Sequence, residues 1–164
     1  MTPIVIDNSI VLAWCLAGES DPIADRAMEI AVDHGAVVPG IWWYELRNAL
    51  VVNERRGRLD AADTQAMLAD LREMPIAIDS DHDEGAVLNL ARAHALSVYD
   101  AAYLEVAQRR ALPLATLDRR LCEAAAKARL VVLKGDRRGA RATHAGKART
   151  TRRRPRLRRG RDRQ

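Results

Sequence analysis

Four carboxylates stand where apolar segments of this sequence end or turn. A carboxylate embedded in apolar sequence is costly unless it is paired or binds a metal ion. Four of them, spread along one chain, indicate that the fold gathers them into one acidic pocket. Oxygen ligands of this kind suit Mg²⁺, with Mn²⁺ as a second possibility. The four residues are Asp7, Glu45, Asp100 and Asp118.

Each of these carboxylates also has a structural explanation when taken alone. Asp7 and Asp118 could each cap a following helix, and Ser97 with Asp100 has the spacing of a capping box. Glu45 lies beside an apolar helix face but could still reach solvent. Four separate structural explanations would have to apply at once, so the joint placement of the four carboxylates carries the prediction of a shared site.

Three polar residues are positioned to support these carboxylates. Ser9 follows Asp7 by two residues and could orient it. Asn48 is one helical turn after Glu45 and could donate a hydrogen bond to it. Thr116 ends an apolar segment, so its hydroxyl could bind a carboxylate or a phosphate.

Short apolar segments alternate with helical patterns along the chain. Strands are expected at 4–6, 36–38, 76–78, 114–116 and 130–133. The segments between them predict helices over 9–17, 22–34, 41–56, 61–74, 82–95, 98–110 and 121–128, with Asp21, Asp60, residues 79–81 and Ser97 near their starts. This order predicts an α/β fold, a three-layer α/β/α domain with a central, mainly parallel sheet of about five strands.

The predicted topology explains why the carboxylates should meet. Ligands of parallel α/β sheets bind outside the carboxyl ends of the strands. Asp7 and Asp118 both follow expected strands, so both should lie at that edge.

Charge divides the chain of 164 residues into two parts. Residues 134–164 hold 14 Lys and Arg against 2 Asp and Glu, whereas residues 1–133 hold 13 against 20. We therefore expect one folded domain over 1–133 and a basic, disordered tail over 134–164, which would raise the affinity for RNA without sequence preference if RNA is bound. No apolar run is long enough to span a membrane and no signal peptide is evident, so we expect a cytoplasmic protein.

Four segments resemble the motifs of the PIN-domain family. Residues 5–14 contain Asp7 and Ser9, residues 39–48 contain Glu45 followed three positions later by Asn48, and residues 116–118 end at Asp118. Residues 96–104, Leu-Ser-Val-Tyr-Asp-Ala-Ala-Tyr-Leu, give the most specific match. The resemblance covers 1 to about 133, with the motifs in the expected order, and is greatest to the short VapC-type toxins of type II toxin–antitoxin systems.

This resemblance implies a PIN-like fold and a Mg²⁺- or Mn²⁺-dependent endoribonuclease. The four carboxylates would be catalytic and metal-binding, with Asp7 and Asp100 as the best direct ligands. A divalent ion there would polarise the phosphoryl oxygen and activate a water for attack. The resemblance also implies an RNA substrate, inhibition by a cognate small antitoxin, and a homodimer. The Arg-rich segment after Leu133 and the Asn at position 8 depart from the family pattern.

Other enzyme classes lack their motifs in this sequence. No Gly-rich phosphate loop follows the first strand, no Gly-x-Ser-x-Gly elbow is present, and Ser9 occupies the position where a phosphotransferase would need a second Asp. The alternative that stays open is a catalytically silent PIN-like module that binds RNA or regulates. Loss of metal-dependent cleavage on Asp7→Asn would distinguish the two.

Overall fold

The computed structural model describes residues 2–16 and 21–135, which alternate strands and helices as the sequence predicts. The strands are β1 (Ile4–Ile6), β2 (Ala36–Pro39), β3 (Ile76–Asp79) and β4 (Leu114–Ala115). The helices are α1 (Asn8–Cys15), α2 (Pro22–His34), α3 (Trp42–Arg55), α4 (Ala61–Arg72), α5 (Glu84–His94), α6 (Val98–Arg109) and α7 (Arg119–Lys127).

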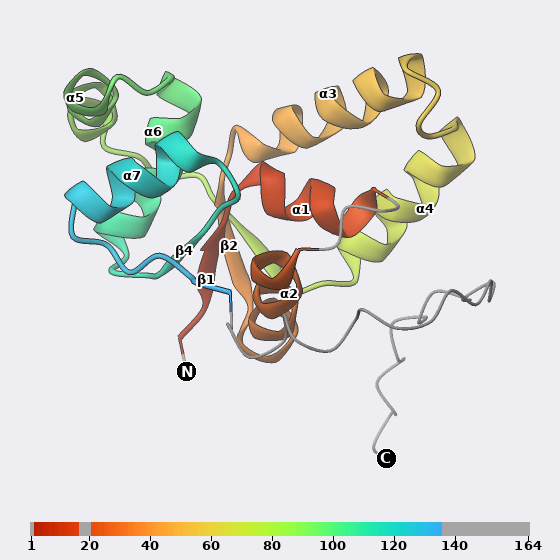
Figure 1. Cartoon of the computed structure of the whole chain (residues 1–164), viewed down its shortest axis with the longest axis horizontal. Coiled ribbons are helices and arrows are strands. Elements are labelled where there is room, and N and C mark those ends of the chain that lie inside the picture. The colour runs from red at the N-terminus through yellow and green to blue at the C-terminus, as the bar shows by residue number, and fades with distance from the viewer. Residues whose placement is uncertain (1, 17–20, 136–164) are drawn as a thin grey trace, which may run out of the picture.

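The four strands form one parallel sheet in the order β3-β2-β1-β4. In register, Val5 of β1 pairs with Val37 of β2 on one side and with Leu114 of β4 on the other. All strands therefore end at one edge, where α1 follows β1 and α3 follows β2 (Figure 1). Because central parallel strands are covered on both faces, β1 and β2 are apolar and fully buried, whereas the edge strand β3 is partly exposed and ends at Asp79.

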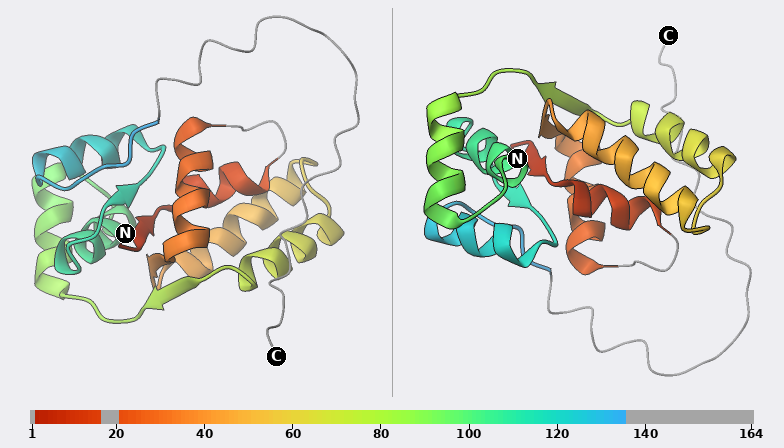
Figure 2. Two further views of the ribbon diagram at one scale, coloured as in Figure 1. Left: turned by 90° about the horizontal axis from the view of Figure 1, so that it is seen from below. Right: turned by 90° about the horizontal axis from the view of Figure 1, so that it is seen from above.

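Helices cover both faces of this sheet, which confirms the three-layer architecture. Helix α2 packs against β1, β2 and β4, and α1 lies against α2 and α3. Helix α6 packs against the same three strands, with α5 and α7 beside it. Figure 2 shows α5, α6 and α7 on one side of the sheet and α1 to α4 on the other.

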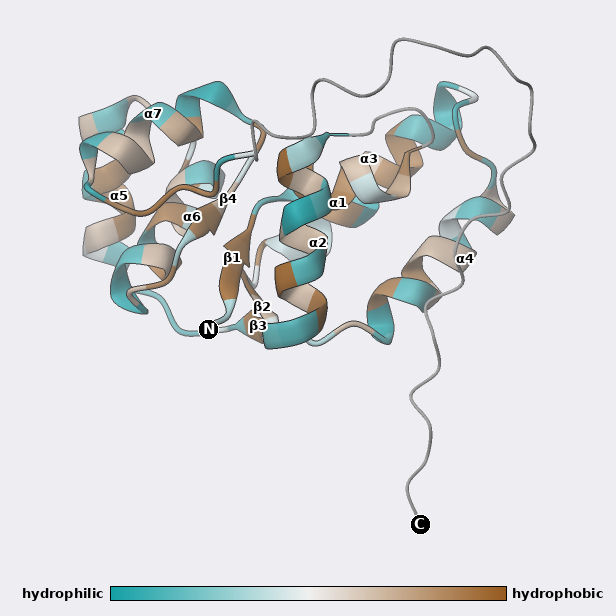
Figure 3. Ribbon diagram, turned by 60° about the horizontal axis from the view of Figure 1, so that its bottom comes forward, coloured by the Kyte–Doolittle hydropathy of each residue, from teal (hydrophilic) through white to brown (hydrophobic). Residues whose placement is uncertain are grey.

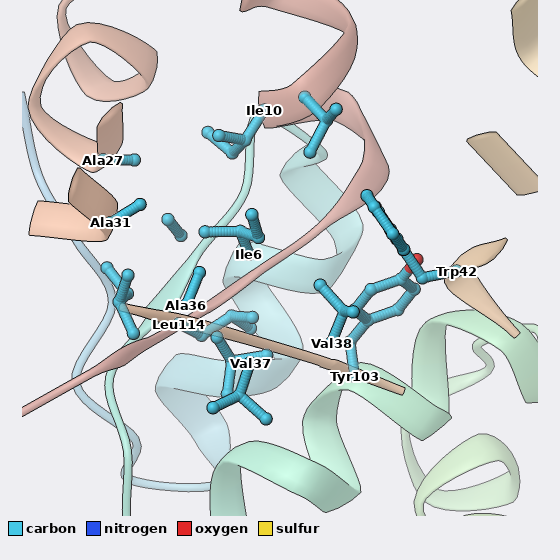
Figure 4. Packing of buried hydrophobic residues seen from close by; sticks show 14 of the residues in the cluster. Ile6, Ile10, Ala27, Ala31, Ala36, Val37, Val38, Trp42, Tyr103 and Leu114 are labelled. Carbon is cyan, nitrogen blue, oxygen red and sulfur yellow. The ribbon is translucent and has the colours of Figure 1, made fainter. Parts of the chain in front are cut away.

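Apolar side chains from both layers meet at the central strands. Figure 3 shows β1 as hydrophobic along its length, and Figure 4 shows Ile6, Val38 and Tyr103 in the packed interior. Ile6 and Val38 are completely buried. Burying a branched aliphatic side chain contributes about 1.5–3 kcal/mol, so this core holds the strand ends in fixed positions.

The expected fifth strand is reduced to an isolated parallel bridge between Leu114 and Val132. Strand β4 has only two residues, and Val131 is largely exposed, so residues 130–133 have little ladder to extend. The expected cap of α5 at residues 79–81 was also wrong, since Asp83 is the residue whose carboxylate accepts the Ala86 N–H.

Predictions about the basic segment remain untested, because residues 136–164 lie outside the described part of the chain. Within the described residues, every helix is too short or too polar to cross a bilayer.

Candidate metal centre

Asp7 is held at the end of β1 by hydroxyl groups from two elements. It is only 7% exposed and caps α1. Its Oδ2 accepts hydrogen bonds from Ser9 Oγ at 2.7 Å and from Thr116 Oγ1 at 2.5 Å. Its Oδ1 accepts only the longer 3.3 Å bond from the Ser9 N–H. The structure therefore places Ser9 and Thr116 where the sequence predicted supporting residues.

Glu45 lies in the first turn of α3 and is held from α6. Tyr103 donates its hydroxyl to Glu45 Oε2 at 2.5 Å, across 58 residues of sequence. Tyr103 is 1% exposed. The predicted bond from Asn48 is not among the hydrogen bonds of the described residues, and Asn48 is exposed. The partner of Glu45 is therefore a residue that the sequence did not identify.

Asp100 lies in the first turn of α6, three residues after the N-cap Ser97. The Asp100 N–H donates to Ser97 Oγ at 3.0 Å, and that hydroxyl donates to Asp100 Oδ2 at 2.7 Å. Ser97 therefore caps α6 and also holds the Asp100 carboxylate, and the sequence spacing was compatible with both roles.

Asp7 and Asp100 both act electrostatically on Glu45, and Asp100 acts on Asp7, so the three carboxylates lie within electrostatic range of one another. Burial raises the pKa of Asp7, hydrogen bonds from Thr116 and Ser9 oppose this, and the charge of Asp100 adds to it. Burial also raises the pKa of Glu45, Tyr103 opposes the rise, and Asp7 and Asp100 add to it. Among the described residues, no Lys or Arg forms an ion pair with any of the three.

Asp118 occupies a different position from these three. It is exposed, and its Oδ1 accepts the N–H groups of Arg120 and Leu121 as the N-cap of α7. It is linked to Asp7 through Thr116, whose Oγ1 also accepts the Asp118 N–H at 2.9 Å. Asp118 therefore borders the group, and the charges that raise the pKa of Glu45 come from Asp7 and Asp100.

The donor set fits a hard divalent cation. Asp7, Glu45 and Asp100 supply carboxylate oxygens, and each holds one oxygen in a hydroxyl bond while the other is free or weakly bonded. In the described part of the chain, no three acidic, His or Cys side chains already lie close enough to enclose an ion. Side-chain rotation would therefore have to bring the three free oxygens onto it.

A second acidic group lies further along α6 and is neutralised by arginines. Glu105, 2% exposed, accepts from Arg109 Nε at 2.6 Å. Asp79, at the end of β3, pairs with Arg109 at 3.3 Å and with Arg110 at 3.1 Å. Burial alone would raise the pKa of Asp79, yet the bonds from Arg110 and the Asp81 N–H and the two positive charges hold it below its usual value.

A pocket of about 620 Å³ adjoins this second group rather than the first. Tyr44, Val98, Ala102 and Glu105 are part of its lining, together with the β3–α5 loop. Asp7, Glu45 and Asp100 do not line it. On α6, Val98 and Ala102 lie on a different face from Asp100, so the largely apolar pocket and the carboxylates open separately.

The parallel sheet and the carboxylates at its edge define the class of this protein, and the sequence profile of the PIN domain matches residues 4–127. The chain belongs to the PIN-domain family. It is similar to Ribonuclease VapC3 of Pyrobaculum aerophilum, with 34% identity over 124 residues, which are 73% of this chain and 92% of that protein.

Two solved structures share the fold. The crystal structure of PAE2754 from Pyrobaculum aerophilum has a TM-score of 0.60 and 25% identity, covering 75% of this chain and 84% of the other. The crystal structure of FitAcB from Neisseria gonorrhoeae has a TM-score of 0.57 and 15% identity, covering 80% and 96%. The second likeness bears on the fold alone.

Proposed function

We propose that this protein is a divalent-metal-dependent endoribonuclease and the toxin of a toxin–antitoxin pair. The observation that carries the proposal is the group of Asp7, Glu45 and Asp100. These carboxylates come from three segments of the chain, act on one another electrostatically, and form no ion pair with a Lys or Arg of the described residues, which supports a cation as their partner. The similarity to a protein named as a ribonuclease supports RNA as the substrate.

In the proposed mechanism, Asp7, Glu45 and Asp100 hold the cation through their free oxygens. Ser9 and Thr116 hold Oδ2 of Asp7, and Ser97 holds Oδ2 of Asp100, so a modest rotation of each side chain would present its other oxygen to the ion. Asp118 borders the site and could bind through water. When bound, Mg²⁺ or Mn²⁺ would neutralise the phosphodiester and activate the attacking water.

No histidine of the described chain competes for the role of general base. His34, His82 and His94 are the described histidines, and none forms a hydrogen bond with Asp7, Glu45 or Asp100. The chain itself therefore contributes carboxylates and hydroxyls to the reaction. We further propose an antitoxin partner and a homodimer, both from the resemblance to VapC-type toxins.

The test is cleavage of single-stranded and structured RNA in Mg²⁺, in Mn²⁺ and in a chelator. We expect cleavage that needs the ion and that falls by roughly 1000-fold in Asp7→Asn, which is several kcal/mol of barrier. Glu84→Gln, an exposed acid in the first turn of α5, is the matched control and should cleave normally. RNA binding without turnover in any ion would favour the silent module instead.

A further inference from the structure

Tyr103 carries a hydroxyl that core packing does not require. Its ring lies in the interior with Val38 and Trp42, where a phenylalanine would fill the same space (Figure 4). A buried hydroxyl costs free energy unless it finds a partner. Its partner is Glu45 Oε2 at 2.5 Å.

The bond connects two helices that lie in different layers of the fold (Figure 2). Among the side-chain hydrogen bonds of the described residues, it is the one that joins α3 to α6. Helix α6 also carries Asp100, three residues before Tyr103, so both lie within one turn of the same helix. The hydroxyl therefore fixes Glu45 directly relative to the element that supplies Asp100.

We infer that Tyr103 is a positioning residue for the proposed nuclease site, acting through Glu45. Its hydroxyl holds Oε2 and leaves Oε1 as the oxygen available to a metal ion. Asp7 and Asp100 show the same arrangement, since hydroxyls hold Oδ2 of each. Each carboxylate then offers one oxygen, which is the one-oxygen ligation that Mg²⁺ accepts in octahedral sites. The inference rests on the proposed function.

The decisive variant is Tyr103→Phe, which keeps the ring and removes the hydroxyl. We expect the metal-free protein to stay folded, and Mn²⁺ affinity measured by calorimetry to fall by roughly 10-fold or more, as for other residues that orient metal ligands. With RNA, kcat should fall while KM changes little. Tyr99→Phe is the matched control, because Tyr99 lies on the same helix and is 56% exposed, and it should behave as wild type.

A double variant tests whether the effect passes through Glu45. In a Glu45→Ala background the hydroxyl has no carboxylate to hold, so adding Tyr103→Phe should not weaken the residual Mn²⁺ affinity further. Independent, multiplying effects would overturn the inference, as would wild-type Mn²⁺ affinity in Tyr103→Phe. Unfolding of Tyr103→Phe would show that the hydroxyl serves the fold, and would also overturn it.

Failure of the proposed function has a different signature. One outcome is that wild type shows no Mn²⁺ binding that depends on Asp7, as judged by comparison with Asp7→Asn. Both the metal-dependent function and the positioning role of Tyr103 would then be wrong. If wild type bound Mn²⁺ and cleaved RNA while Tyr103→Phe matched it, only the role of Tyr103 would fall.

Discussion

Helix α6 takes part in two acidic groups that solve the same electrostatic problem differently. At its start, Asp100 lies near Asp7 and Glu45, and hydroxyls are the side-chain partners of all three. Near its end, Arg109 pairs with Glu105 of the same helix, and Arg109 and Arg110 both pair with Asp79 of β3. The first group has raised pKa values at Asp7 and Glu45, and the second has a lowered pKa at Asp79.

The difference distinguishes an acidic group whose charge arginines balance from one whose charge, in the proposed function, a divalent cation would balance. Buried carboxylates matched with arginine fork geometry have their charge balanced within the chain, and here they fix the β3–α5 loop to α6. Hydroxyl donors orient carboxylates but leave their negative charge uncompensated. Asp7 and Asp79 are 7% and 8% exposed, so at equal burial the identity of the partner separates the arginine-paired group from the candidate site.

The largest expected effect is on catalysis, at Asp100. Asp100→Asn can still accept the Ser97 hydroxyl through its amide oxygen but is a poorer ligand for a hard cation. We expect cleavage to fall by roughly 1000-fold while the melting temperature stays close to wild type. Cleavage assays paired with thermal melts measure this, and a loss of activity that merely follows a loss of folded protein would contradict it.

Binding of Mg²⁺ to the group of Asp7, Glu45 and Asp100 should stabilise the folded protein. At an ion concentration of about 100 times Kd, Mg²⁺ should stabilise the folded protein by about 2.7 kcal/mol. A melting series in MgCl₂ should show this rise for the wild type and not for Asp7→Asn. An equal rise in both proteins would mean that the ion binds elsewhere.

The arginine-paired group should matter for stability and not for chemistry. Glu105→Gln removes the charge that accepts from Arg109, and about 2 kcal/mol of unfolding free energy should be lost, a value reduced because Arg109 is partly exposed. Chemical denaturation measures the loss. Asp81→Asn, which changes an exposed acid in the β3–α5 loop, is the control. A cleavage rate per folded molecule that fell as in Asp100→Asn would break the distinction between the two groups.

The smallest expected effect is on the pH dependence of stability. The folded pKa of Glu45 is raised, so its contribution to metal-free stability is present below its ordinary pKa of 4.5 and is lost as pH rises through the folded value. Glu45→Gln should therefore gain stability relative to wild type as pH rises through that window. Asp79 has the opposite sign, and Asp79→Asn should lose its stability difference from wild type as pH falls through the lowered pKa of that residue. Denaturation midpoints across pH test both signs.

The sequence predicted those parts of the site that depend on local order along the chain. Asp7 after an apolar strand, Ser97 as a cap and Thr116 as a hydroxyl donor were all identified from their immediate neighbours, and the structure places all three so. These positions follow from backbone periodicity and capping chemistry, which act over a few residues.

The parts that the sequence missed depend on packing between distant segments. Tyr103 reads as an apolar core position, and only the tertiary fold, which brings the start of α3 to the first turns of α6, places its hydroxyl on Glu45. A signal was present, since Tyr103 follows Asp100 by one helical turn. The arginine-paired group went unnoticed for the same reason, because Asp79 and Arg110 are 31 positions apart.

The bond between Asp7 and Thr116 has a consequence for synthesis of the chain. These residues are 109 positions apart, so Asp7 is synthesised well before its partner. Chains grow at about 5–20 residues per second, so β1 waits seconds for β4. A nascent or truncated chain that ends before Thr116 lacks one of the two hydroxyls that hold Asp7 in the proposed cation site. The proposed site is therefore complete only after Thr116 has been translated.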